Sequence, residues 1–182
     1  MNTIRTILSI ASSYKWEIHQ MDVKSAFLNG DLNEEIYMQQ LASFINVESS
    51  NLVCKLHKSL YGLKQAPRAW YDKIDAYFLT NGFKQCIFDP NMHIKNFDDD
   101  VLIVILCVND LILTAIHLTF IQEMKNNLKK QFEMPDLGLL HYFLGLKICH
   151  RVDGILLSHP KYVTNLLSQF HMSDCKPSPM PF

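Results

Sequence analysis

Long apolar runs, a basic excess and a paired set of cysteines are all missing from this 182-residue sequence. No apolar run approaches the roughly 20 residues that a membrane-spanning helix needs. The N-terminus also lacks the basic stretch and apolar segment of a secretory signal. We therefore expect no membrane partner and no targeting signal, with a cytoplasmic or nuclear location.

The cysteines are odd in number and scattered, which suits reduced thiols better than a disulfide framework. We expect no disulfide partner. Cys54 and His57 have the spacing of zinc ligands, but no second pair stands at a matching interval, so we do not expect zinc. The eight histidines show no metalloprotease spacing. The cysteines are Cys54, Cys86, Cys107, Cys149 and Cys175.

Charge is nearly balanced, with 17 basic and 18 acidic residues and a formal net charge of −1. This balance weakens any case for tight, free-standing nucleic-acid binding, which usually needs a basic excess. One segment still gathers basic residues, with only Asp72 opposing them, and it is either a solvated helix face or a phosphate-contacting surface. Its basic members are Lys55, Lys58, Lys64, Arg68 and Lys73.

Hydrophobic residues make up 48% of the chain and charged residues 19%, which is typical of a globular protein with a real core. Apolar residues at helical spacing and alternating β-rich runs predict the elements. We expect α+β architecture, with helices packed on one face of a mainly antiparallel sheet. The predicted helices cover 2–14, 67–81, 121–132 and 161–170. The predicted strands cover 16–23, 34–40, 52–56, 91–97, 101–108, 111–115, 140–152 and 154–160.

Two acidic positions, far apart in sequence, attract attention. Asp22 ends a predicted strand, and Asp110 follows Asn109 in a hairpin turn between two apolar runs. If the two strands are neighbours, both carboxylates reach one edge of the sheet, as a divalent-metal site requires. An ordinary Asn-Asp turn and an unrelated strand end explain the same residues. A further acidic run at the tip of a predicted hairpin, residues 98–100, is expected to be solvated.

Five long segments together resemble, in order and spacing, the reverse transcriptase of copia-type LTR retrotransposons, and the resemblance runs from about residue 3 to 181. It implies the palm of an RNA-directed DNA polymerase, with fingers and thumb truncated. Residues 1–182 would form one domain fragment, and the thumb would start near 155–182. The segments are QMDVKSAFLNGDLNEEIYM, LHKSLYGLKQAPRAWYDK, CVNDLILTA, LGLLHYFLGLKI and GILLSHPKYVTNLL.

The resemblance also implies a metal site. Asp22 matches the aspartate that ends a strand, and Asp110 matches the second aspartate of the turn, so both are expected to be catalytic metal ligands. Asn109 stands where the family has its other turn aspartate. Two magnesium ions about 3.5 to 4 Å apart would stabilise the attacking hydroxyl and the leaving pyrophosphate. Asn109 removes one negative charge, so we expect weakened metal binding.

The nucleotide site is implied in the same way. Phe27, five positions after Asp22, matches the aromatic gate that excludes a ribose 2′-hydroxyl. Tyr61 and Gly62 match the segment that lies against the incoming nucleotide. The resemblance also brings Lys64, Arg68 and the helix that follows toward the template or the triphosphate, without a fixed role for either side chain.

Departures from the family pattern point to a degraded copy, inactive as it stands. Besides Asn109, Cys107 replaces the usual tyrosine of Tyr-Val-Asp-Asp, and Ala115 replaces an expected glycine. The implied partners are an RNA or DNA template-primer and a deoxynucleoside triphosphate. The alternative function is a non-catalytic nucleic-acid-binding or interaction module built on the palm.

Overall fold

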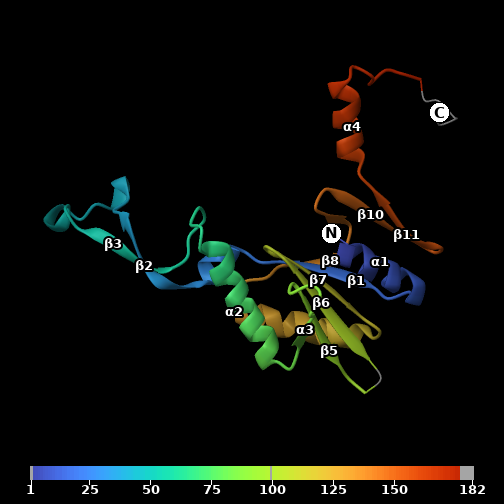
Figure 1. The fold of residues 1–182 in the computed structure, drawn as a ribbon, viewed down its shortest axis with the longest axis horizontal. Coiled ribbons are helices and arrows are strands. Elements are labelled where there is room, and N and C mark those ends of the chain that lie inside the picture. Colours follow the sequence, from blue (N-terminus) through green and yellow to red (C-terminus); the bar gives the residue numbers. More distant parts are fainter. Residues whose placement is uncertain (1, 99, 177–182) are drawn as a thin grey trace. The chain divides into compact units, whose positions relative to one another are not determined.

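The computed structural model describes residues 2–98 and 100–176 and shows two compact units (Figure 1). The larger unit comprises residues 17–138, and the smaller one combines the described parts of 1–16 and 139–182. Asp99, and the final part of the expected thumb segment, 177–182, lie outside the described residues. The helices are α1 (Asn2–Tyr14), α2 (Ala66–Thr80), α3 (Leu118–Gln131) and α4 (Pro160–Gln169), with short 3₁₀ turns η1 (Ala26–Asn29), η2 (Ala42–Phe44) and η3 (Val47–Ser49). The strands are β1 (Ile18–Asp22), β2 (Asp31–Gln39), β3 (Val53–Lys58), β4 (Lys84–Gln85), β5 (Met92–Asn96), β6 (Val101–Cys107), β7 (Asp110–Ala115), β8 (Asp136–Leu139), β9 (Tyr142–Phe143), β10 (Leu146–Arg151) and β11 (Gly154–Ser158).

A six-stranded sheet forms the centre of the larger unit, in the order β4-β5-β6-β7-β1-β8. Every pair from β4 through β1 is antiparallel. The β-branched and aliphatic runs of β6 and β7 supply its middle, because such side chains suit a pleated, buried surface. The mixed content of helices and antiparallel strands agrees with the expected α+β class.

Helices α2 and α3 share one hydrophobic core with one face of this sheet. Alternation along the strands places one set of apolar side chains on that face, because successive residues point to opposite sides. Helix α2 starts as expected, with Pro67 in its first turn, and it stops before Gly82, which has φ +82°. The core side chains are Met21, Leu102, Val104, Leu106, Leu111 and Leu113 from the strands and Trp70, Ile74, Phe78, Ile121, Met124 and Leu128 from the helices.

The opposite face of the sheet carries a second row of buried apolar residues, including Ile18 of β1, Ile105 of β6 and Ile112 of β7. Ile105 stands opposite Ile112, which in turn stands opposite Gln20 of β1. Side chains directly opposite each other share a face. A buried glutamine therefore lies among aliphatic residues on this face, two positions from Asp22.

The loop between β5 and β6 corrects one expectation from the sequence. Asp98 is exposed as expected, but Asp100 is buried. Its carboxylate accepts backbone N–H bonds from Val101 at 2.6 Å, Ile116 at 2.9 Å and His117 at 3.0 Å. These three hydrogen bonds offset the cost of removing the carboxylate from water. Asp100 therefore links the residues that follow β7 to this loop instead of being solvated.

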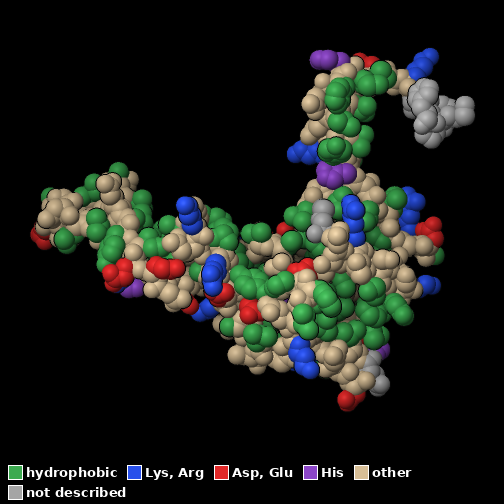
Figure 2. Space-filling model, in the orientation of Figure 1, with side chains coloured by type: hydrophobic (Ala, Val, Ile, Leu, Met, Phe, Trp, Pro, Cys, Tyr) green, Lys and Arg blue, Asp and Glu red, His purple; other side chains and the backbone are tan. Residues whose placement is uncertain are grey.

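A two-stranded arm made by β2 and β3 also belongs to the larger unit. None of its strand residues is buried, and large apolar side chains near its far end are exposed (Figure 2). Two strands alone supply too little core for independent stability. The exposed side chains include Tyr37, Leu41, Phe44, Val47 and Leu52.

In the smaller unit, β9, β10 and β11 form an antiparallel sheet in the order β11-β10-β9. Helix α1 buries Ile4, Ile7, Leu8 and Ala11 and contacts β11, whereas α4 has no buried residue. Among the described residues, none of the helices combines the length and the apolar character needed to cross a bilayer.

Candidate functional site

Strands β1 and β7 bring the two acidic positions together. Asp22 stands directly opposite Asp110 in the antiparallel register, and Asp110 stands opposite Cys107 of β6. The expected adjacency of the two strands is therefore confirmed. Residues opposite each other project from the same face. Cys107, Asp110 and Asp22 thus form a row across three neighbouring strands, on the sheet face away from α2 and α3.

The hairpin turn lies one residue earlier than the sequence predicts. Because Cys107 pairs with Asp110, the loop residues are Val108 and Asn109, and Asp110 is the first residue of β7. Val108 has φ +57°, and Asn109 is not among the residues with positive φ. A positive φ at the first loop residue alone is typical of a type II′ turn, where glycine is usual. A β-branched residue there is strained.

Buried groups hold this strained turn in place. The indole Nε1–H of Trp70, on α2, donates to the carbonyl oxygen of Val108 at 2.7 Å. The amide of Val23, just after β1, donates to the carbonyl oxygen of Asn109 at 2.8 Å. Trp70 is only 1% exposed and packs edge-on against Phe132. The core therefore fixes the backbone of the turn from both sides.

Each of the two carboxylates accepts a hydrogen bond from a side-chain amide. Asn109 Nδ2 donates to Asp22 Oδ1 at 2.6 Å, and Gln20 Nε2 donates to Asp110 Oδ1 at 2.8 Å. Asn109 thus presents its donor, not its carbonyl, to the neighbouring acid. Sequence reasoning missed Gln20. The sequence feature that could have indicated it is its position two residues before Asp22, which places a polar side chain on the same face of the same strand.

The electrostatics of this row disfavour further negative charge. Burial raises the pKa of Asp110, the hydrogen bond from Gln20 lowers it, and the charge of Asp22 raises it, with a net increase. Burial and the nearby Asp110 carboxylate likewise raise the pKa of the Cys107 thiol. A bound cation would relieve this repulsion. The row is therefore acidic, half-buried and electrostatically suited to a positive ligand.

The donor set fits magnesium only in part. Asp22 and Asp110 are hard carboxylate ligands of the kind magnesium prefers, and each keeps one oxygen that no amide occupies. Cys107 is a soft ligand that suits other metals. Across residues 2–98 and 100–176, no group of three or more His, Cys, Asp or Glu side chains is arranged to hold a metal ion. Two carboxylates are thus present where the resemblance implies three.

The residues expected to line the nucleotide also come together. Phe27, in η1, is half-buried against the core, and its ring lies 4.6 Å from that of Tyr61 between centroids. Ser59 Oγ donates to the carbonyl oxygen of Phe27. Tyr61 is 61% exposed, and Gly62 has φ +96°. Phe27 and Tyr61 form an aromatic pair with one exposed ring.

Close packing, not a turn conformation, explains the glycine at position 30. Its φ is −73°, so no left-handed conformation calls for glycine there. A Cβ atom at Gly30 would lie 2.7 Å from the backbone of Ala69 and of Trp70. Glycine is needed because α2 packs directly on this segment. This contact sets the distance between η1, which carries Phe27, and the helix that carries Trp70.

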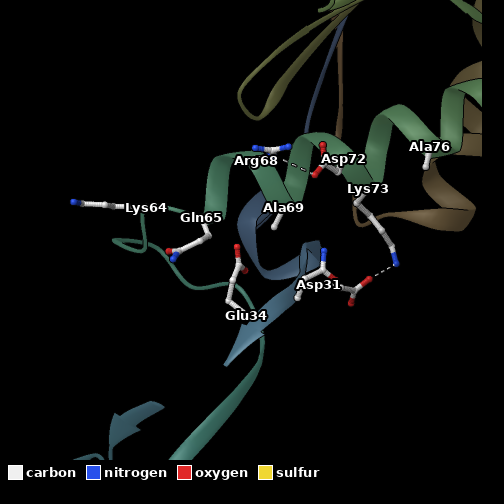
Figure 3. Close-up of a pocket in the computed structure, with 10 residues that line it drawn as sticks. Asp31, Glu34, Lys64, Gln65, Arg68, Ala69, Asp72, Lys73 and Ala76 are labelled. Atoms are coloured by element: carbon white, nitrogen blue, oxygen red, sulfur yellow. Dashed lines mark hydrogen bonds and ion pairs between the residues drawn. The ribbon is translucent and has the colours of Figure 1, made fainter. Parts of the chain in front are cut away.

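Three cations of the basic segment, Lys64, Arg68 and Lys73, line an open groove of about 710 Å³ between β2 and the start of α2 (Figure 3). The expectation that only Asp72 opposes these cations is wrong, since Asp31 and Glu35 of β2 also contribute. Lys73 contacts Asp31 at 2.7 Å, Lys55 pairs with Glu35, and Arg68 lies 3.8 Å from Asp72. The sequence alone could not predict that β2 lies beside these cations. The groove is therefore mixed in charge.

Residues 1–182 match the family described as reverse transcriptase (RNA-dependent DNA polymerase). The chain is 42% identical over 184 residues to the retrovirus-related Pol polyprotein from transposon TNT 1-94 of Nicotiana tabacum, covering 100% of this chain and 14% of that protein. It is 37% identical over 179 residues to the corresponding polyprotein from transposon RE1 of Arabidopsis thaliana, covering 98% and 12%.

A shorter relative, the putative transposon Ty5-1 protein of Saccharomyces cerevisiae, is 32% identical over 162 residues, covering 88% of this chain and 53% of that protein. The chain thus spans only a small part of the length of the plant polyproteins. No solved structure matches it. With a family match over the whole chain and plant relatives at 35 to 42% identity, this chain belongs to the reverse transcriptase family of copia-type transposon Pol polyproteins.

Proposed function

We propose that this chain is the palm-centred part of an RNA-directed DNA polymerase whose catalytic site has lost one metal ligand. Asp22 and Asp110 are the remaining ligands, and Asn109 occupies the third position. The observation that carries the proposal is the 2.6 Å bond from Asn109 Nδ2 to Asp22 Oδ1. An aspartate there would bring a third negative charge to the site. The asparagine brings a donor, which occupies a ligand oxygen.

The proposed reaction is attack of a primer 3′-hydroxyl on the α-phosphate of a deoxynucleoside triphosphate, with pyrophosphate leaving and a template strand selecting the base. Magnesium, when bound, supplies electrostatic stabilisation of the reacting phosphate. The free oxygens of Asp22 and Asp110 would hold it. Strands β1 and β7 fix where those oxygens lie, because positions on paired strands move less than positions on loops.

Loss of charge is the reason for proposing impaired activity. Magnesium gives up its water reluctantly and depends on charged oxygen ligands. Replacing one carboxylate by an amide removes one negative charge from the site and leaves the fold of the turn intact. Substitution of residues that hydrogen-bond to metal ligands, without binding the metal themselves, already weakens metal binding or activity by about 10 to 100-fold. The loss of a direct ligand should exceed this.

Phe27 and Tyr61 are proposed as the nucleotide-side wall of the site, with Gly62 beside them. The tilted aromatic pair gives a rigid apolar surface five residues beyond Asp22. A ring fixed there would collide with a 2′-hydroxyl and so favour deoxyribonucleotides. The mixed-charge groove at Lys64 and Arg68 supports a weak template contact at most, since two of its three lining cations, Arg68 and Lys73, are ion-paired.

The test uses a chimera in which the rest of the polymerase comes from the tobacco relative. Wild-type and Asn109→Asp chimeras are compared for primer extension with magnesium or manganese, at equal folded concentration on one template-primer. We expect little extension by the wild type and recovery in Asn109→Asp. Asp110→Asn in the repaired chimera, as a matched loss of one charge, should abolish the recovery.

Robust, equal extension by both chimeras would refute the impaired-site proposal. Equal absence of extension would place the defect elsewhere, for example at Cys107. Salt-dependent binding of duplex by the wild type, without extension even after Asn109→Asp, would favour the alternative of a non-catalytic nucleic-acid-binding module.

A further inference from the structure

Gln20 lies on β1, two residues before Asp22, and faces the same side of the sheet as both acidic residues. It is 8% exposed, and its strand partner Ile112 is 1% exposed. An amide in such an apolar setting is costly unless its polar atoms are paired. Its Nε2 donates to Asp110 Oδ1 at 2.8 Å, between residues that are 90 positions apart.

This bond restricts the carboxylate of Asp110 rather than Gln20 alone. A carboxylate on a strand rotates about its terminal bond with a broad, roughly two-fold preference. A charge-assisted bond to one oxygen selects one rotation and leaves the other oxygen free. The side chain of Gln20 comes from the strand that also carries Asp22, so it sets Asp110 relative to Asp22 directly.

We propose that Gln20 is a positioning residue for the metal site, which orients Asp110 so that its free oxygen and that of Asp22 serve the same cation. This proposal rests on the proposed function. Asn109 and Gln20 make similar amide bonds to the two carboxylates, but they act in opposite ways. Asn109 stands in the place of a ligand, whereas Gln20 supports a ligand from behind. Repair of position 109 should therefore restore metal binding only while Gln20 is present.

A purely structural role would make a different prediction. If Gln20 only satisfies its own buried amide, replacing it with an apolar residue of the same length should leave cation affinity unchanged. Gln20→Met removes the donor and keeps the unbranched shape. Gln122→Met is the matched control, because Gln122 is exposed on α3 and, among the described residues, its amide bonds only Asn126, at 3.3 Å.

The experiment measures manganese binding to the full 182-residue chain by electron paramagnetic resonance of the free ion, with folding checked by circular dichroism. In the Asn109→Asp background, Gln20→Met should weaken affinity by about 10-fold or more, the range for residues that support metal ligands. Gln122→Met should leave it unchanged. Affinity within twofold of the parent in a folded Gln20→Met protein would overturn the proposal.

A further variant separates the two levels of inference. Asp22→Asn in the Asn109→Asp background should abolish binding. If it does not, Asp22 is not a ligand, and the proposed function and the role of Gln20 both fall. If Asp22→Asn abolishes binding while Gln20→Met has no effect, only the role of Gln20 is wrong.

A second measurement needs no change at Gln20 and so does not depend on the folding of that variant. In ¹⁵N-labelled Asn109→Asp protein, magnesium is titrated while the side-chain amide signals of Gln20 and Gln122 are followed. The Gln20 signal should shift with the midpoint of cation binding, because its acceptor becomes a metal ligand. The Gln122 signal should stay in place. A Gln20 signal unmoved at saturation would overturn the proposal.

Discussion

Trp70→Phe tests whether the core fixes the turn at Val108 and Asn109. The change keeps an aromatic ring in the buried position but removes the N–H that donates to Val108 at 2.7 Å. The lost hydrogen bond is worth about 1 kcal/mol net. The missing ring atoms add about 1 kcal/mol more, a fraction of the roughly 3 to 5 kcal/mol of a full aromatic truncation. With the turn held in its conformation, the two losses sum to about 2 kcal/mol in the free energy of unfolding.

The strain of Val108 makes this prediction specific. A left-handed conformation costs an L-residue about 1 to 2 kcal/mol. Without the indole, the turn can leave that conformation, and the released strain then offsets part of the loss from Trp70→Phe in the native chain. Val108→Gly removes the strain, offset by about 0.5 to 1 kcal/mol of backbone entropy. Glycine keeps the backbone carbonyl that accepts from the indole and leaves no strain to release, so in the Val108→Gly background Trp70→Phe should cost the full value of about 2 kcal/mol, more than in the native chain.

The assay is urea denaturation of the four proteins of this double-mutant cycle, followed by circular dichroism. A loss of about 2 kcal/mol corresponds to a fall of about 4 to 8 °C in Tm for a chain of this size. Trp16→Phe is the control, because Trp16 is the other of the two tryptophans and is half-exposed. Strict additivity of Trp70→Phe and Val108→Gly, or a loss below about 0.5 kcal/mol from Trp70→Phe in the Val108→Gly background, would refute the argument that the indole holds the turn.

Three further predictions follow from the same geometry. Gly30→Ala should lower the free energy of unfolding by about 1 to 3 kcal/mol in urea titrations, since its Cβ would overlap the α2 backbone. Asp110→Asn should raise Tm at pH 7 in metal-free buffer and give no gain at pH 3. The reason is that burial, together with the smaller effect of the Asp22 charge, raises the pKa of Asp110 despite the hydrogen bond from Gln20. An equal gain at both pH values would contradict this. Phe27→Ala in the repaired chimera should increase ribonucleotide incorporation in a competition assay, and unchanged sugar selectivity would remove its assignment as the gate.

The pH prediction follows from the direction of the shift. A carboxyl whose pKa is higher in the folded chain than in the unfolded chain makes folding less favourable once pH rises through these values. At pH 7 the ionised Asp110 therefore opposes folding, and asparagine removes that cost while still offering an oxygen to Gln20. Below the unfolded pKa the acid is protonated in both states, so the advantage of asparagine disappears.

Much of the secondary structure could be predicted because local patterns decide it. The helical spacing around Trp70 and the apolar runs on either side of the turn gave the right elements, and Pro67 and Gly82 marked the ends of α2. The exact loop could not be predicted. Local propensity favours Asn-Asp for a left-handed loop residue, but a bond from α2 holds Val108 there instead.

The site was predicted unevenly for the same reason. Asp22 and Asp110 could be chosen from the resemblance, and their register confirms that they are neighbours, while their role as metal ligands stays a proposal. Gln20 and the packing role of Gly30 were missed because each depends on a contact with a distant segment. The acids opposing Lys55 and Lys73 were missed because they lie on β2.

The location of Asn109 in the loop has a consequence for how such a chain changes over time. Asp110 lies within the ladder, so its neighbours constrain its direction, while Asn109 lies between two paired strands and its backbone carbonyl is held by Val23 whatever its side chain. Chemistry and folding are therefore separable at this position. A copy of the gene no longer selected for polymerisation can lose the carboxylate there and still encode a chain with the same sheet, so an intact fold is no record of an intact enzyme.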